Sequence, residues 1–250
     1  MNKVNNMKIA IIGTGHIGKT MVRKLTKAGH SIQMANSRGP ETLKELAEET
    51  GAKALTAREA VQDVDVIILS IPLNKLPDMK ELLAGLPDKV IVADTSNYYP
   101  LRDEHIEALD KGQVESEWVS EQVGRPIIKA WNNVLAETFA DHGRPAGAEG
   151  RIALSVAGDD PEGKKIVMSL VEDTGFDAID GGTLAESWRQ QPGTPGYCAE
   201  QTIEELETAL AAADKSRAPK VRDEIMKEVL VLGDKLTRED LLRFNRTFSS

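Results

Sequence analysis

Cysteine and histidine are scarce in this chain of 250 residues. Cys198 is its one cysteine, so no intrachain disulfide can form, and this usage fits a reducing cytoplasm. The histidines lie far apart in the sequence, and neither they nor the cysteine have metal-ligand spacing, so we expect no metal site. The histidines are His16, His30, His105 and His142.

Positive charge and long apolar runs are also lacking. Lys and Arg total 31 against 40 Asp and Glu, a formal net charge of −9, which argues against nucleic acid or an anionic membrane as a partner. The strongest apolar run, 64–71, is interrupted by Asp65 and is far too short to cross a bilayer. The residues before Met7 are polar and lack an apolar signal region. We therefore expect a cytoplasmic protein that acts on a small molecule.

A glycine-rich segment of defined spacing stands near the start of the chain. An apolar run, 7–12, leads directly into a Gly-x-Gly-x-x-Gly pattern, and a helical pattern follows. In this strand–loop–helix context the pattern predicts a dinucleotide site, in which the glycines allow a sharp turn, close approach of the pyrophosphate and close helix packing. The phosphates then lie at the positive end of the helix. The residues assigned to this part of the site are Gly13, Thr14, Gly15, His16, Ile17 and Gly18.

The residues after the second predicted strand indicate which dinucleotide is bound. This strand, 31–35, ends in Asn36-Ser37-Arg38-Gly39, about where an NAD site carries Asp or Glu for the ribose 2′-hydroxyl. The chain offers a hydroxyl and a guanidinium instead, and the fork of Arg38 suits a phosphate dianion. An ordinary solvated turn before the next helix is the simpler interpretation. Because position and chemistry coincide, we expect NADP(H), bound in part by Asn36, Ser37 and Arg38.

Strand and helix patterns alternate along most of the chain, which is typical of a Rossmann-type, doubly wound, mainly parallel α/β sheet. The further strands expected here are 54–55, 66–72, 89–93 and 126–130. Ligands bind outside the carboxyl ends of such strands, although polar loops follow every strand. We place Ser70, Ile71 and Pro72 under the adenosine-side ribose and pyrophosphate. Toward the nicotinamide we place Ser96, Asn97, Ala130, Trp131 and Asn132.

The C-terminal part has a different organisation. The elements expected first are a strand at 151–157, a helix at 161–174 and a strand at 175–180. The turn-rich stretch 187–197 is predicted either as an acceptor-binding loop or lid, or as a plain connector. Apolar stripes beyond it predict a tail of helices that pack on the body or on a second copy in a homodimer. We therefore divide the chain into an NADP-binding Rossmann domain, 1–132, and a C-terminal α/β segment with a helical tail, 133–250, that closes the acceptor side.

Five short motifs resemble, in order, those of the NADP oxidoreductases that use the 5-deazaflavin coenzyme F420. They are Gly-Thr-Gly-His-Ile-Gly, Asn-Ser-Arg-Gly, Ser-Ile-Pro-Leu, Asp-Thr-Ser-Asn and Lys-Ala-Trp-Asn-Asn, and the match spans about 8–181. The same domain type is similar to the cytoplasmic part of the STEAP metalloreductases. The resemblance implies that Ser37 and Arg38 hold the 2′-phosphate, and that the Lys-Ala-Trp-Asn segment borders the nicotinamide and an acceptor flavin. Two departures are Trp131 in place of the family's Phe, and a Ser-Asn-Pro motif that is present as Ser-Asn-Tyr-Tyr-Pro at 96–100.

Hydride transfer to a flavin-like ring needs little side-chain chemistry, because the two rings carry it while the protein orients them and excludes water. No acid/base constellation is visible in this sequence, so we assign no catalytic residue. Lys129 is a candidate proton donor, but a structural lysine whose stem reaches solvent is the favoured interpretation. Trp131 and Trp188 are candidate stacking platforms, although packing is the commoner role of tryptophan. Arg189 is available for an anionic acceptor tail.

The sequence thus predicts an NADP(H)-dependent oxidoreductase that transfers hydride between NADPH and a flavin-like or deazaflavin acceptor. A hydroxyacid or imine reductase of the 6-phosphogluconate dehydrogenase type is a second hypothesis, although such enzymes need a longer helical C-terminal domain than this chain has room for. A redox-sensing NADP-binding module without chemistry of its own is a third. Turnover of NADPH with different acceptors separates the enzymes from the sensor.

Overall fold

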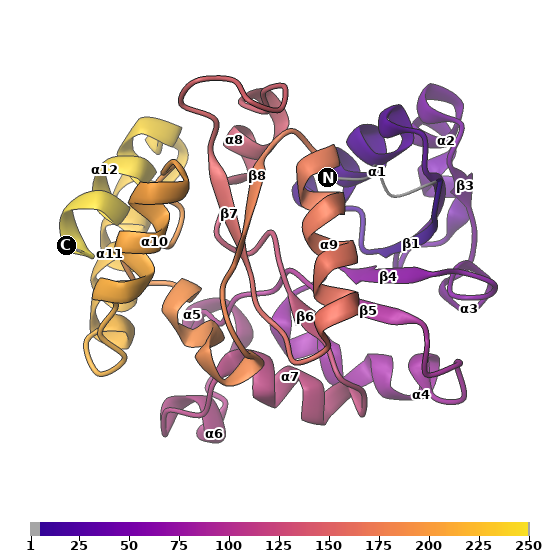
Figure 1. The fold of residues 1–250 in the computed structure, drawn as a ribbon. Helices are drawn as coiled ribbons and strands as arrows, with labels where there is room; N and C mark the ends of the chain where they lie inside the picture. The colour runs from indigo at the N-terminus through magenta and orange to yellow at the C-terminus, as the bar shows by residue number, and fades with distance from the viewer. Residues whose placement is uncertain (1–5, 250) are drawn as a thin grey trace.

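The computed structural model describes residues 6–249, whose strands form two sheets (Figure 1). The strands are β1 (Lys8–Ile12), β2 (Ser31–Ala35), β3 (Lys53–Ala54), β4 (Val66–Leu69), β5 (Ile91–Asp94), β6 (Ile128–Lys129), β7 (Ala153–Val156) and β8 (Asp177–Asp180). The first six form a parallel sheet in the order β3-β2-β1-β4-β5-β6. The direction of winding reverses between β1 and β4, as in dinucleotide-binding folds. The expected Rossmann-type α/β fold is confirmed.

Two strands of the main sheet, β4 and β6, are each three residues shorter than the sequence predicts. β4 ends at Leu69, so 70–72, which we expected inside the strand, form the turn after it. β6 consists of Ile128 and Lys129 alone. Pro126 stands at the start of the predicted strand and has no N–H to donate to a ladder, which explains the late start of β6.

Helices cover both faces of the main sheet and form the tail. The helices are α1 (His16–Ala28), α2 (Lys44–Thr50), α3 (Ala57–Ala60), α4 (Lys80–Leu83), α5 (Pro100–Asp103), α6 (Glu107–Asp110), α7 (Glu115–Val123), α8 (Ala136–Asp141), α9 (Pro161–Asp173), α10 (Ile203–Ala212), α11 (Ala218–Leu232) and α12 (Arg238–Phe248), and the 3-10 helices are η1 (Pro40–Leu43), η2 (Leu73–Met79), η3 (Leu184–Gln190) and η4 (Gly233–Lys235). Several helix ends carry well-defined caps. Gly29 closes α1 in the left-handed conformation, and Thr56 and Thr237 each open a helix with a capping box.

The second sheet consists of β7 and β8, which are parallel and connected by α9. It is joined to the main sheet through β6, because Lys129 and Ala157 exchange two backbone hydrogen bonds in an antiparallel bridge. The C-terminal α/β segment is therefore hydrogen-bonded to the edge strand of the dinucleotide-binding sheet. It lies beside the end of the sheet where the nicotinamide is expected.

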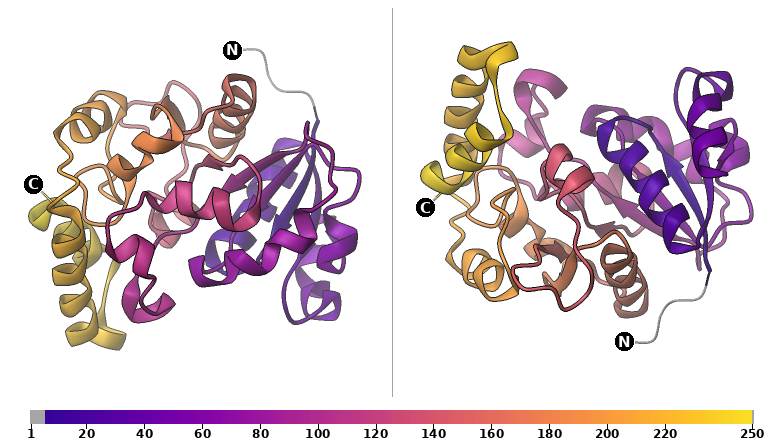
Figure 2. Two further views of the ribbon diagram at one scale, coloured as in Figure 1. Left: turned by 90° about the horizontal axis from the view of Figure 1, so that it is seen from below. Right: turned by 90° about the horizontal axis from the view of Figure 1, so that it is seen from above.

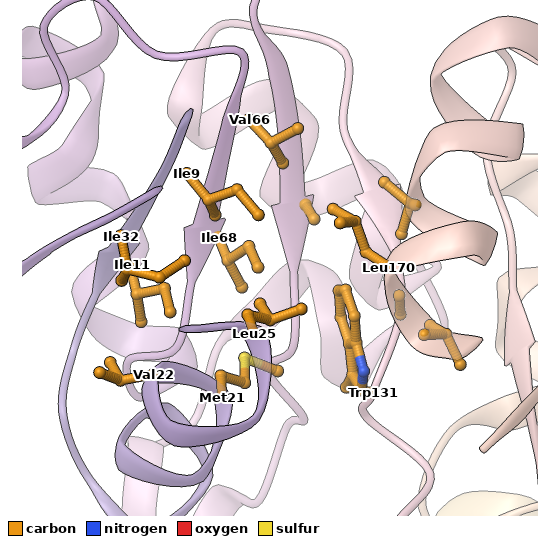
Figure 3. Close-up of a cluster of buried hydrophobic side chains, with 14 of the residues drawn as sticks. Ile9, Ile11, Met21, Val22, Leu25, Ile32, Val66, Ile68, Trp131 and Leu170 are labelled. Atoms are coloured by element: carbon orange, nitrogen blue, oxygen red, sulfur yellow. The ribbon is translucent and has the colours of Figure 1, made fainter. Parts of the chain in front are cut away.

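The core is split by the main sheet, because successive side chains of a strand point to opposite faces. Ile9 and Ile11 of β1 pack with α1 and α9 on one face, whereas Ala10 and Ile12 pack on the other, with α3 and α7. Figure 3 shows the first face, with the β1 and β4 side chains over those of α1. The apolar face of α1 is buried at Met21, Val22 and Leu25. This packing holds the N-terminus of α1 against the end of β1.

The tail helices lie at the end of the molecule opposite β1–β3, as both views of Figure 2 show. Leu206 and Leu210 of α10 pack on β7 and β8, so this helix lies on the body as expected. α11 and α12 pack on each other around Val221, Ile225 and Phe244. Within 6–249, no helix has both the length and the apolar content required to cross a membrane.

Candidate functional site

The glycine-rich loop connects β1 to α1, and each glycine has its own geometric role. Gly13 has φ of 99°, and a Cβ there would lie 2.1 Å from the Ser70 carbonyl oxygen. A Cβ on Gly18 would lie 2.0 Å from the Gly13 carbonyl oxygen. Gly13 and Gly18 therefore allow the turn and the close packing of α1. Gly15 differs, because a Cβ there would meet nothing within 4 Å, so its backbone is open to a ligand.

A cavity of about 460 Å³ lies at this loop, within the size range of small-molecule sites. Its walls come from the ends of β1, β2 and β4, three neighbouring strands of the sheet. The predicted site residues that line it are Gly13, Thr14, Gly15, Asn36, Ser37, Arg38, Ser70, Ile71 and Pro72. His16, Ile17 and Gly18 form the first turn of α1 beside it. The structure thus brings together the residues placed at the adenosine and pyrophosphate side.

Asn36 ties the loop after β2 to the glycine-rich loop. Its side-chain amide donates to the hydroxyl oxygens of Thr14, at 3.3 Å, and Thr42, at 2.9 Å. Its side-chain oxygen accepts a hydrogen bond from the Arg38 backbone N–H at 2.9 Å. Because Asn36 uses both ends of its side chain in this way, we assign it a positioning role: it fixes the loop that carries Ser37 and Arg38.

The Arg38 side chain is exposed at the rim of the cavity. Its guanidinium has no hydrogen-bond or ion-pair partner among the residues that the structure describes. It is therefore available to an anionic ligand group, and no carboxylate from β2 competes for the same position. The chemistry of this rim suits a phosphate rather than a ribose hydroxyl pair.

Sequence reasoning missed five residues of the cavity wall. They are Ile12, Ala57, Lys75, Asp78 and Met79. Lys75 and Asp78 are exposed on η2, the 3-10 helix that follows β4. Lys75 adds a second cation to the wall, and Asp78 adds a carboxylate. A lone lysine in a polar segment has no characteristic spacing, and only the position directly after β4 could have drawn attention to it.

The other predicted residues, at the ends of β5 and β6, do not line this cavity. We call the set Ser96, Asn97, Ala130, Trp131 and Asn132 the nicotinamide-side edge. Its members are buried or half-buried. Asn97 and Asn132 bond to each other through two hydrogen bonds, of 2.9 and 3.1 Å. Gln190 of η3 donates to the Asn132 side-chain oxygen at 2.8 Å, and its carbonyl accepts from the Asn132 amide at 2.9 Å. The structure therefore covers this edge with the segment 184–190.

Of the two roles considered for Trp131, packing in the core is the one that the structure shows, and the ring is not available as a stacking platform. The side chain is 1% exposed and lies in the core beside Leu170 of α9 (Figure 3). Its indole N–H donates to the Thr174 hydroxyl at 3.3 Å. With φ of 54°, Trp131 also adopts a left-handed backbone conformation, which turns the chain sharply after β6. The burial by α9 could not be seen in the sequence around Trp131.

The structural role favoured for Lys129 is confirmed, but the side chain does not reach solvent. Its side chain is 1% exposed, and its ammonium group forms an ion pair with Asp94 and donates to the Ser96 carbonyl oxygen at 2.8 Å. Asp94 is fully buried and also accepts from the Ser96 hydroxyl at 3.0 Å. Buried charges are tolerated when they are paired and hydrogen-bonded, as here. Lys129 thus fixes the ends of β5 and β6 to each other.

The stretch 187–197 is packed into the body rather than extended from it. Ser187, Gln190 and Thr194 are each at most 1% exposed. Arg189 lies over the Trp188 ring at 4.5 Å and donates to the Leu210 carbonyl oxygen at 3.1 Å. Arg189 and Trp188 are therefore engaged with each other and with α10.

Cys198 has the character of a structural thiol. It is 2% exposed, and burial raises its pKa to about 12, so the reactive thiolate is a negligible fraction at neutral pH. Across the described part of the chain, no group of three or more His, Cys, Asp or Glu residues is arranged to hold a metal ion.

Comparison with known proteins extends this picture. A family model described as NADP oxidoreductase, coenzyme F420-dependent, matches residues 8–98. The F420-dependent NADP reductase of Methanocaldococcus jannaschii is 27% identical over 205 residues, which is 72% of this chain and 86% of that protein. The protein YjhV of Escherichia coli K12 is 40% identical over 112 residues, 44% of this chain and 82% of YjhV.

Two further similarities concern a metalloreductase and a solved structure. The metalloreductase STEAP3 of Rattus norvegicus is 25% identical over 181 residues, which is 72% of this chain but 35% of STEAP3. The crystal structure of the hypothetical protein SMa0349 from Sinorhizobium meliloti shares 32% identity with a TM-score of 0.63, over 72% of this chain and 87% of that chain. The resemblance seen in the motifs is confirmed.

Proposed function

This chain belongs to the family of coenzyme F420-dependent NADP oxidoreductases, and from that premise we propose that it transfers a hydride between NADPH and a flavin-like or deazaflavin acceptor. Membership makes it an NADP-dependent oxidoreductase. The nature of the acceptor and the residues that hold the dinucleotide are the proposed part.

The cavity at the glycine-rich loop is the observation that carries the proposal. Gly15 leaves open space where any side chain would stand, directly before the first turn of α1, where backbone N–H groups lack helical partners. A pyrophosphate fits such a place because it accepts hydrogen bonds from those groups and lies at the positive end of the helix. We place it against 14–18, with the adenosine side toward Ile71 and Pro72.

The rim of the cavity supports NADP over NAD. Ser37 and Arg38 provide a hydroxyl and an unpaired guanidinium, and Lys75 stands on the opposite wall, after β4. A 2′-phosphate between these groups would be held by charge-assisted hydrogen bonds, which are stronger than neutral ones. Asn36 contributes indirectly, because it fixes the loop.

The nicotinamide-side edge supports an acceptor that needs no proton from the protein. Reduction of a carbonyl or imine requires a proton donor near the nicotinamide. The ammonium of Lys129, the candidate there, is buried against Asp94 and the Ser96 carbonyl. A flavin-like ring accepts a hydride without such a donor, and the cofactor supplies this hydride chemistry when bound.

In this proposal the chain's own residues bind, orient and exclude water. The glycine-rich loop and Arg38 bind the two phosphate positions of the dinucleotide. Asn97, Asn132 and Gln190 form a hydrogen-bonded frame that fixes the edge on which the nicotinamide is expected to lie. The rigid frame limits the positions the two rings can take, which is the protein's main contribution to such a reaction.

A panel of acceptors tests the proposal. The purified protein is given NADPH with riboflavin, FMN, coenzyme F420 or ferric citrate, and NADPH oxidation is followed at 340 nm against protein-free mixtures. We expect turnover with at least one ring acceptor and a loss of that turnover in the Gly15→Val variant. Oxidation with none of these acceptors, together with measurable NADPH binding, would favour the sensor hypothesis. Oxidation by small 2-oxo acids or imines alone would favour the second enzyme hypothesis.

A further inference from the structure

A second, smaller cavity lies at the junction of the body and the tail. Its volume is about 50 Å³, and it opens between the start of α7, the residues around η3 and the start of α11. The polar residues around it are Glu115, Gln113, Trp188, Gln191, Lys215 and Arg222. Three segments that are distant in sequence therefore meet at one small space, and most of their polar groups are hydrogen-bond donors.

This cavity lies directly behind the nicotinamide-side edge. Tyr98, which follows Asn97 of that edge, lines it, and the Tyr98 backbone N–H donates to the Glu115 carboxyl at 3.0 Å. Gln191, another wall residue, follows Gln190, the residue that holds Asn132. Tyr98 is thus one residue away from the edge, and Gln191 is one residue away from the residue that covers it, so the cavity and the edge share parts of their walls.

Positive charge and unused donors gather in the cavity. Arg222 is 8% exposed and stacks over the Tyr98 ring at 5.2 Å. Its Nε and Nη2 atoms contact Asp223 at 2.8 Å, whereas Nη1 has no hydrogen-bond partner within 6–249. The buried Gln191 Nε2 atom also lacks a partner, and Lys215 adds a second cation at the surface. A buried donor without a partner costs about 1–3 kcal/mol, so a bound acceptor atom would stabilise the site.

Glu115 is the acidic group of the cavity and is held close to neutrality. Its carboxyl is buried, and burial raises its pKa to about 7. The positive charges of Lys129 and Arg222 lower this pKa, whereas the negative charge of Asp94 raises it. Below pH 7 the carboxyl is mainly protonated and is itself a donor. Above pH 7 it becomes an anion and would repel another anion in the same space.

We propose that this cavity is an oxyanion subsite that binds a carboxylate group of the acceptor. The guanidinium of Arg222, the Gln191 amide and the Glu115 hydroxyl supply three kinds of donor to the two oxygens. At about 50 Å³ the cavity is far below the usual volume of a whole-ligand site, so it takes one functional group and leaves the rest of the molecule outside. The assignment of the carboxylate to the acceptor rests on the proposed function. The anion subsite itself is independent of that function.

Direct titration tests the subsite without any turnover. Trp188 lines the cavity, and its indole N–H gives an NMR signal that a Trp188→Phe variant assigns. Sodium formate and acetate are titrated at pH 6, with acetamide, sodium chloride and inorganic phosphate as comparison probes. We expect a saturable shift with formate and acetate and none with acetamide or chloride. No saturable shift with either carboxylate would overturn the proposal, and binding of phosphate alone would overturn the carboxylate assignment.

Matched variants assign the binding to the cavity. Arg222→Met should lower the acetate affinity at least tenfold, Arg222→Lys should retain part of it, and Arg243→Met, on the exposed face of α12, should leave it unchanged. Thermal unfolding and NADPH affinity, measured on the same samples, show that Arg222→Met is folded and that its dinucleotide site is intact. Equal acetate affinity in Arg222→Met and Arg243→Met would contradict the proposal.

The pH dependence provides an independent check. Acetate affinity should fall at least threefold between pH 6 and pH 8.5 in the wild type, because Glu115 loses its proton across this range. The fall should vanish in Glu115→Gln, which stays neutral. The same fall in both proteins would contradict the assigned role of Glu115.

Turnover provides a further comparison. For any acceptor that the wild type reduces, we expect a lower KM for the acceptor with a carboxylate than for the same acceptor with an amide in its place. In Arg222→Met this difference in KM should disappear. Failure of all turnover would count against the proposed function, whereas the acetate titration would still decide on the subsite.

Discussion

The two halves of the sheet edge differ in how they are built. On the β1–β2–β4 side, the strand ends surround a cavity of about 460 Å³ whose walls include the glycine-rich loop and the exposed side chains of Arg38 and Lys75. On the β5–β6 side, the strand ends are buried, charged and hydrogen-bonded, and η3 covers them. The first half is shaped to receive a ligand, and the second is shaped to remain fixed.

This difference shows where the chain places rigidity. A dinucleotide binds mainly through backbone groups, which a single glycine-rich loop can present. Hydride transfer depends on the distance and angle between two rings, so the other half needs a frame that does not move. The buried Lys129–Asp94 pair and the Asn97–Asn132–Gln190 frame provide it. Substitutions on the fixed side should therefore mainly lower stability, whereas substitutions on the open side should mainly lower nucleotide affinity.

The largest effect is expected from Lys129→Met on the fixed side. It leaves Asp94 buried without its partner, and removing one member of a buried ion pair typically costs about 3–5 kcal/mol. Chemical denaturation should show a free energy of unfolding lowered by about this amount. The double variant Lys129→Met/Asp94→Leu should recover much of the loss, since neither charge is then buried. A single variant as stable as the wild type would show that the pair does not fix this edge.

Gly15→Val should act on the open side without unfolding the protein. A side chain at Gly15 meets no protein atom within 4 Å, but it occupies the space assigned to the pyrophosphate. We expect NADPH affinity to fall about 100-fold or more, roughly 2.8 kcal/mol, with little change in unfolding temperature. Gly13→Ala is the contrasting control, because its Cβ would lie 2.1 Å from the Ser70 carbonyl oxygen and should lower stability. Unchanged NADPH affinity in Gly15→Val would remove the loop from the site.

Arg38→Ala should have a more selective effect on the same side. Charge-assisted hydrogen bonds are worth about 1.5–3 kcal/mol, so NADPH affinity should fall about tenfold or more, while NADH affinity changes little. Calorimetric titration of both nucleotides into both proteins measures the difference. An equal loss for NADPH and NADH would mean that Arg38 does not contact the 2′-phosphate. Lys75→Ala, on the opposite wall, should show the same selectivity more weakly.

The smallest effect should be a pH-dependent one on the fixed side. Glu115 titrates near pH 7 in the folded protein because burial raises its pKa, and near 4.5 when unfolded. Between pH 4.5 and pH 7 the carboxyl is protonated in the folded state but ionised in the unfolded state. The stabilisation by the neutral carboxyl is therefore complete below pH 4.5 and is lost as the pH rises through 7. Glu115→Gln should therefore show a smaller drop in unfolding temperature from pH 5 to pH 8 than the wild type. Parallel curves would place the pKa of Glu115 near its ordinary value.

The sequence was sufficient for the open side because its signals are local. Gly13, Gly15 and Gly18 lie within six residues of one another, and Ser37 and Arg38 follow a strand whose pattern is clear. The doubly wound, mainly parallel sheet also follows from the alternation of strand and helix patterns. Lys75 and Asp78 escaped detection because a 3-10 helix after β4 gave no recognisable pattern.

The fixed side could not be predicted because its partners are distant in sequence. Lys129 is buried by Asp94, 35 positions away, and Asn132 is covered by Gln190, 58 positions away. Trp131 was assigned to the ligand because its neighbours resemble a family motif, but α9 buries its ring. Whether a residue at a strand end faces a ligand or the core is decided by which later segment packs there.

The most direct test of this account is a calorimetric titration of the wild-type protein with NADPH and with NADH at neutral pH and moderate salt. We expect saturable heat with NADPH and an affinity for NADPH at least tenfold higher than for NADH. An absence of heat with either nucleotide at millimolar concentration, or tighter binding of NADH, would contradict it.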